Sequence, residues 1–170
     1  MIRQYAGVLL LAGIMVVIQT TLVPELSGVL FIDFIFVMVV LVGMFKDPVH
    51  GAIMAFLLGG FQDIMSGQIV GLFMTSRLLV FLAAQFLRSR VSLEKPAPQF
   101  AMGTGLGLAD RLAIFVLCGI FSEPLSLTGS EFAFMAGGVL INAALVPVFY
   151  QLFRLLPGFY EPKRGPVVRR

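Results

Sequence analysis

Cysteine, histidine and tryptophan are nearly missing from this chain of 170 residues, which has one cysteine, one histidine and no tryptophan. Cys118 has no second thiol with which it could form an internal disulfide. A zinc site of cysteine and histidine ligands needs about four such residues. Because this chain has only Cys118 and His50, the sequence excludes such a site. A Ser/His/Asp catalytic arrangement is not indicated either, because its only possible histidine, His50, lies at a predicted cytoplasmic helix end.

Charged residues are also scarce. They make up 12% of the chain, whereas a soluble domain has about a quarter, and 59% of the residues are hydrophobic, with a mean hydropathy of +1.00. The net charge of +3 does not suggest nucleic acid binding, because the basic excess is spread along one predicted membrane face and the tail. The period-two alternation of a β-barrel is absent. The composition therefore predicts a single-domain, all-α integral membrane protein.

Long apolar stretches are what the sequence does contain. A membrane-spanning helix needs about 20 consecutive, mainly apolar residues. Six stretches approach this length, and the first is too long for the apolar region of a signal peptide, so we expect it to be retained. A transmembrane domain, 1–156, would then be followed by a basic cytoplasmic tail, 157–170. The six expected helices are 5–23, 29–45, 49–65, 69–87, 100–121 and 131–156.

Basic residues occur in alternate connections between these stretches. The connections 24–28, 66–68 and 122–130 have none. Because lysine and arginine mark the cytoplasmic side of a membrane protein, the alternation predicts six spans with both termini in the cytoplasm. The ten basic residues concerned are Arg3, Lys46, Arg88, Arg90, Lys95, Arg154, Lys163, Arg164, Arg169 and Arg170.

Five ionisable residues lie inside the expected spans: Asp33, Asp63, Arg77, Asp110 and Arg111. One charge at the centre of a span costs about 2.5–3.5 kcal/mol on insertion scales, so these side chains should face inward and pair. Neighbours in sequence point to different sides of a helix, so Asp110 and Arg111 should have different partners. We expect at least one of the two arginines to pair with at least one of the three aspartates.

Three interpretations of this polar group stay open. It could be a structural salt-bridge cluster, a ligand or ion site in the outer half of the membrane, or a contact with a partner. A protease-like pair of Asp33 and Asp63 lacks the surrounding residues that such a site needs. The glycines between Gly103 and Gly107 lack the lysine and the preceding strand of a phosphate-binding loop. The residues predict no catalytic site, metal or cofactor.

The third expected span has a stripe of small residues. Gly51, Ala55, Gly59, Asp63 and Gly67 recur at every fourth position, which keeps them on nearly one helical face. Small residues at this spacing let another helix approach closely. Packing within the bundle is the favoured interpretation, and a docking groove for a partner helix is the alternative. Weaker versions of the pattern are Gly103, Gly107 and Arg111 in the fifth span, and Gly138 and Asn142 in the sixth.

The segment 48–71 resembles the signature region of the bacterial rod shape-determining protein MreD family. A spaced-glycine helix is followed there by a Gly-x-x-x-Asp-x-x-Ser-Gly-x-x-x-Gly stretch. The matching residues are Gly59, Asp63, Ser66, Gly67 and Gly71. An acid early in the second span, here Asp33, is also usual, as are the length, the six spans and the basic tail. The family often has proline before that acid, whereas this chain has Ile32.

The resemblance implies a non-enzymatic protein of the bacterial cytoplasmic (inner) membrane without cofactors. Its partners would be membrane lipid, an MreC-like single-span protein, and the MreB, RodA and transpeptidase machinery of cell-wall elongation. The implied fold is similar to the substrate-binding subunits of energy-coupling-factor transporters. A vitamin-binding subunit is therefore the alternative function, although the longest outer loop, 122–130, is short for a ligand lid.

Overall fold

The computed structural model describes residues 13, 32–66, 70–91, 94–121 and 129–155. The expected first span at 5–23 and the tail at 157–170 lie outside these residues, apart from Gly13. Gly67 and most of the outer loop 122–130 lie outside them as well. The described residues form helices and their connections. The helices are α3 (Phe34–Phe45), α4 (Pro48–Ser66), α5 (Leu72–Arg88), α6 (Pro96–Phe121) and α7 (Gly129–Leu155).

Three of these helices are long and apolar enough to cross a membrane, judged by length and composition. They are α4, α6 and the part of α7 at Ala133–Leu155. The other two helices are shorter, with 12 residues in α3 and 17 in α5. This all-helical architecture is that of an α-helical membrane protein. The complete set of six spans stays a prediction.

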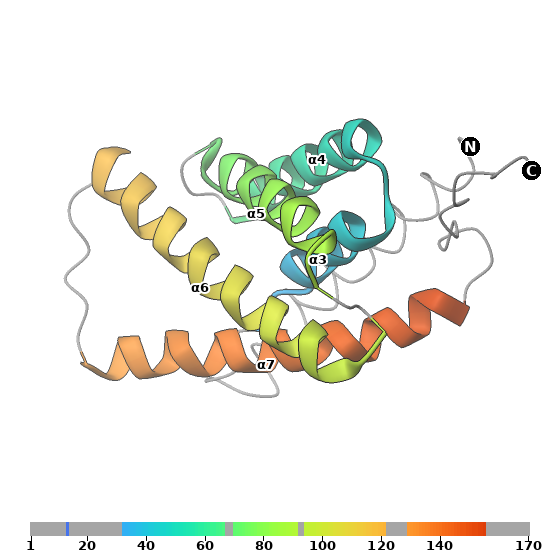
Figure 1. Ribbon diagram of the computed structural model, residues 1–170. Helices are drawn as coiled ribbons and strands as arrows, with labels where there is room; N and C mark the ends of the chain where they lie inside the picture. The colour runs from blue at the N-terminus through green and yellow to red at the C-terminus, as the bar shows by residue number, and fades with distance from the viewer. Residues whose placement is uncertain (1–12, 14–31, 67–69, 92–93, 122–128, 156–170) are drawn as a thin grey trace, which may run out of the picture.

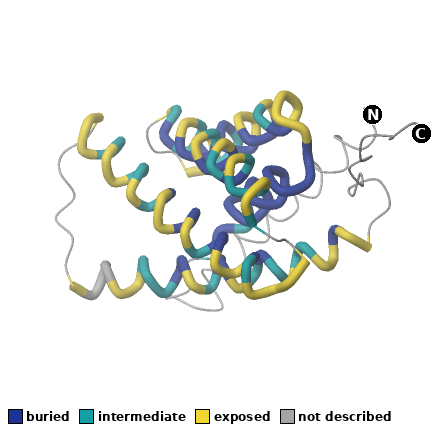
Figure 2. Tube along the Cα trace, in the orientation of Figure 1, coloured by how far each residue is buried: buried dark blue, intermediate teal, exposed yellow. Residues whose placement is uncertain are grey.

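Helix α3 is the centre of the described structure (Figure 1) and contacts α4, α5, α6 and α7. Every residue from Ile35 to Phe45 is buried (Figure 2). A helix that is apolar on all sides needs apolar surroundings on all sides, and the other described helices supply them for this Val- and Met-rich sequence.

The expected second span placed Asp33 inside a helix that starts at residue 29, and here the prediction was wrong. Asp33 is the N-cap of α3, because its Oδ1 atom accepts a hydrogen bond from the Phe36 amide at 2.9 Å. Aspartate is favoured at this position because the first amides of a helix have no acceptor within the helix. The Asp33 carboxylate therefore lies at the N-terminal end of α3 and not within a helix.

The connection between α3 and α4 has residues that favour a helix start, because aspartate suits the N-cap and proline the first helical position. Pro48 is the first residue of α4, and the amide of His50 donates to Asp47 Oδ2 at 3.2 Å. At the other side of this turn, the carbonyl of Lys46 accepts hydrogen bonds from Gln85 Nε2 at 2.7 Å and Arg88 Nη1 at 2.9 Å. The last turn of α5 thus holds the C-terminal end of α3.

Helix α6 begins four residues earlier than expected. The expected spans 69–87 and 100–121 leave Pro96 and Pro98 in the connection between them. The structure instead has both prolines in the first turn of α6. Proline is tolerated there because the amides of the first turn have no partner within the helix. Helix α7 continues through Pro147 to Leu155.

Helices α6 and α7 make close contact at two glycines. A Cβ atom placed on Gly103 would lie 3.1 Å from the Cα of Ala143, and one on Gly107 would lie 2.9 Å from Cγ1 of Val139. Beyond this crossing the helices separate toward Phe121 and Gly129, and in Figure 1 they form a fork. The α6 arm of the fork has exposed apolar side chains, namely Leu112, Phe115, Val116, Ile120 and Phe121.

Candidate functional site

Arg77 is the centre of a buried polar network. Its side chain is fully buried, with 0% of its surface exposed. Nη1 donates to Asp110 Oδ1 at 2.7 Å, Nη2 donates to Asp33 Oδ2, and Nε donates to Gln62 Oε1 at 2.9 Å. The planar guanidinium group has donors that point in several directions, so one side chain can contact three helices or helix ends at once.

Other polar residues complete the network. Gln62 Nε2 donates to Asp33 Oδ2 at 3.3 Å, and the Ser76 hydroxyl donates to Asp110 Oδ1. The backbone amide of Asp33 donates to Asn142 Oδ1 at 2.8 Å. Each described helix supplies at least one member, since Asp33 caps α3, Gln62 is in α4, Asp110 is in α6 and Asn142 is in α7.

Aromatic rings cover the guanidinium group of Arg77. Its Cζ atom lies 5.7 Å from the centroid of the Phe36 ring and 5.5 Å from that of Phe73. A cation near the face of an aromatic ring is attracted by the ring quadrupole. The charge is therefore held by two carboxylates and two rings, away from the surface.

The geometry agrees with the expected pairing of an intramembrane arginine with aspartates. Two carboxylates share one guanidinium group, and each receives a further hydrogen bond from an uncharged donor. Asp33 and Asp110 are almost as buried as Arg77, with 6% and 1% of their surfaces exposed. Removing one member of such a buried group leaves its partners desolvated and unpaired, which is strongly destabilising. The arrangement can hold helices together, and among the described residues no group of possible ligands is suited to a metal.

Asp63 does not belong to the Arg77 network, contrary to expectation. Its carboxylate accepts hydrogen bonds from the amides of Gly71 at 2.9 Å, Phe73 at 2.8 Å and Met74 at 3.1 Å. These amides begin α5, where they have no acceptor within the helix and the helix dipole favours a negative charge. Asp63 therefore joins the end of α4 to the start of α5.

The other matched residues of the MreD-like stretch surround this contact. The Ser66 hydroxyl donates to the carbonyl of Asp63 at 3.1 Å. Gly71 precedes α5 with φ of 99°, a backbone conformation that side chains strongly disfavour. Gly67 lies outside the described residues.

The small-residue stripe of α4 packs against α5. A Cβ atom on Gly59 would lie 2.6 Å from the Cα of Met74, and one on Gly51 would lie 2.4 Å from Cε2 of Phe81. Ala55, between them, is completely buried. This agrees with packing within the bundle. The alternative, a docking groove for a partner helix on this face, is wrong because α5 already covers it.

Arg111 was expected to join the internal network, and this expectation was also wrong. Its side chain is partly exposed, and it makes no ion pair or hydrogen bond with any residue that the structure describes. Consecutive helical residues differ by about 100° in direction, so the inward position of Asp110 turns Arg111 away from Arg77.

Sequence reasoning missed two members of the network, Gln62 and Ser76. Each directly precedes a charged residue, Asp63 or Arg77, in an otherwise apolar helix. Uncharged polar residues at the depth of intramembrane charges were the signal that could have identified them, because buried polar groups need hydrogen-bond partners.

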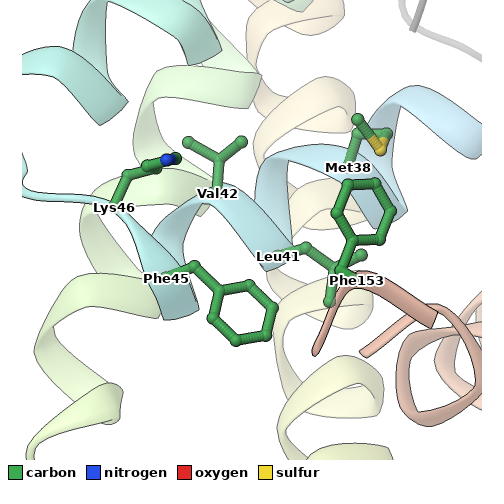
Figure 3. A pocket seen from close by; sticks show the side chains of 6 residues that line it. All are labelled: Met38, Leu41, Val42, Phe45, Lys46 and Phe153. Atoms are coloured by element: carbon green, nitrogen blue, oxygen red, sulfur yellow. The ribbon is translucent and has the colours of Figure 1, made fainter. Parts of the chain in front are cut away.

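A small cavity lies beside α3, away from the network. Its free volume is about 10 Å³, and Figure 3 shows side chains from α3, Lys46 and α7 around it. This volume is roughly the space of one water molecule and is far below the size of a small-molecule site. The lining residues are Met38, Leu41, Val42, Phe45, Lys46 and Phe153.

Comparisons with protein-family models, curated proteins and solved structures found no match to this chain. The resemblance to MreD is therefore a prediction that rests on the motif at 48–71 and on the expected layout of the spans.

Proposed function

We propose that this protein is a non-enzymatic membrane scaffold of MreD type that supports cell-wall synthesis and rod shape. The observation that carries the proposal is the local structure of the motif. Gly59, Asp63, Ser66 and Gly71 were matched from sequence alone, and they meet at the start of α5. Residues that together build one helix–helix connection have a structural role, which is what a scaffold requires.

The network around Arg77 supports scaffolding over catalysis. An acid–base catalyst must reach the proton that it transfers. Arg77 is fully buried, and both of its carboxylate partners are engaged with it. Such an arrangement fixes the positions of five helices and gives the protein a rigid surface for its neighbours.

The proposed location is the bacterial inner membrane, with both termini in the cytoplasm. The proposed partners are an MreC-like single-span protein and the MreB, RodA and transpeptidase machinery. Single-cysteine labelling in a Cys118→Ser background tests the orientation. An impermeant reagent added outside should label a cysteine at position 68 and should not label one at position 165. Labelling at 165 from outside would contradict the proposed orientation.

Purification from native membranes in a mild detergent tests the partners. A tagged chain should recover an MreC-like protein together with wall-synthesis proteins. Gly59→Leu, which disturbs the α4–α5 connection, should reduce recovery, whereas Gly105→Leu should not, since a Cβ atom at Gly105 meets nothing within 4 Å. Recovery of an ATPase module with a bound vitamin would instead support the transporter subunit and contradict the scaffold.

A further inference from the structure

We draw no further inference here: the strongest candidate, the exposed row of α5 side chains Leu79, Leu82 and Phe86 that ends at Arg90, whose guanidinium group lies over the Phe86 ring, carries none, because the expected first span and the basic tail lie outside the described residues and nothing in the structure shows what covers this row.

Discussion

The α4–α5 pair and the α6–α7 pair both pack closely through small residues, but they differ in how the charged residue at the end of each stripe is paired. In both pairs, small residues at every fourth position allow close approach, at Gly59 in the first pair and at Gly107 in the second. The α4 stripe then reaches Asp63, whose carboxylate accepts hydrogen bonds from the first amides of α5. The α6 stripe reaches Arg111, which has no partner among the described residues.

The difference teaches how to interpret a charged residue at the end of such a stripe. Where the chain supplies the counterpart, the helices remain together to their ends and the charge is buried. Where it does not, the helices separate and apolar side chains are exposed on both sides. The first pair is part of the buried core, and the second has exposed apolar side chains where its helices separate.

The largest expected effect is at Arg77. Arg77→Met leaves Asp33 and Asp110 buried without their cation, so it should destabilise the protein by about 3–5 kcal/mol. Arg111→Met is the matched control and should change stability little. Thermal unfolding in detergent, followed by circular dichroism, provides the measurement. Combining Arg77→Met with Asp110→Asn should recover part of the loss. Equal melting temperatures for Arg77→Met and Arg111→Met would contradict the conclusion that only Arg77 stabilises the described helices.

A larger side chain at position 59 should cause the next largest loss of stability. Gly59→Leu forces a side chain against the backbone of Met74, which cannot move as a flexible side chain can. Overpacking of this kind costs about 1–3 kcal/mol or more. Gel filtration should show aggregation or a lower yield for Gly59→Leu and a single sharp peak for Gly105→Leu. Identical profiles would mean that α4 and α5 are not in close contact.

Loss of the Asp63 cap should be smaller. Asp63→Ala removes three hydrogen bonds to α5, and the loss of a helix cap costs about 0.5–2 kcal/mol. Asp63→Asn keeps an acceptor oxygen and should lose less. Hydrogen exchange should become faster at Gly71, Phe73 and Met74 in the alanine variant. Unchanged exchange there would contradict the capping role.

The smallest effect concerns pH at the exposed turn before α4. The hydrogen bond from His50 holds the pKa of Asp47 below its ordinary value of 3.8. A carboxyl with a lowered pKa in the folded protein adds stability above its ordinary pKa, and this contribution is lost as pH falls through the lowered pKa. Asp47→Asn should therefore flatten the acid side of the stability curve below about pH 4 and leave neutral pH nearly unchanged. An unchanged acid side would show that the pair contributes nothing.

Much of this structure was predictable from patterns along the chain. Hydropathy located α3 to α7 to within a few residues at most ends, and the span expected at 49–65 differs from α4 by one residue at each end. The pairing of Arg77 with aspartates followed from the free energy of an isolated charge in a membrane. These predictions work because length, apolarity and charge are local properties of the sequence.

The remainder depends on how helices are rotated and joined. Asp63 and Arg77 have opposite charges at similar depth, yet the Asp63 carboxylate accepts hydrogen bonds from backbone amides of α5. Every residue except proline has such an amide, so the sequence does not indicate which amides a carboxylate will bind. Arg111 was assigned inward with Asp110, although only one of two adjacent residues can face the core. The extended first turn of α6 was missed because proline is read as a helix breaker, whereas position within the helix decides its effect.

The network around Arg77 also has a consequence for biosynthesis. During translation, Arg77 leaves the ribosome after Asp33 and Gln62 but before Asp110 and Asn142. For that interval the nascent chain holds one arginine with one carboxylate and one amide, and its cation is only partly neutralised. Both carboxylate partners of Arg77 are present only after α6 has been synthesised, and the last described helix, α7, then supplies Asn142, which accepts a hydrogen bond from the Asp33 amide.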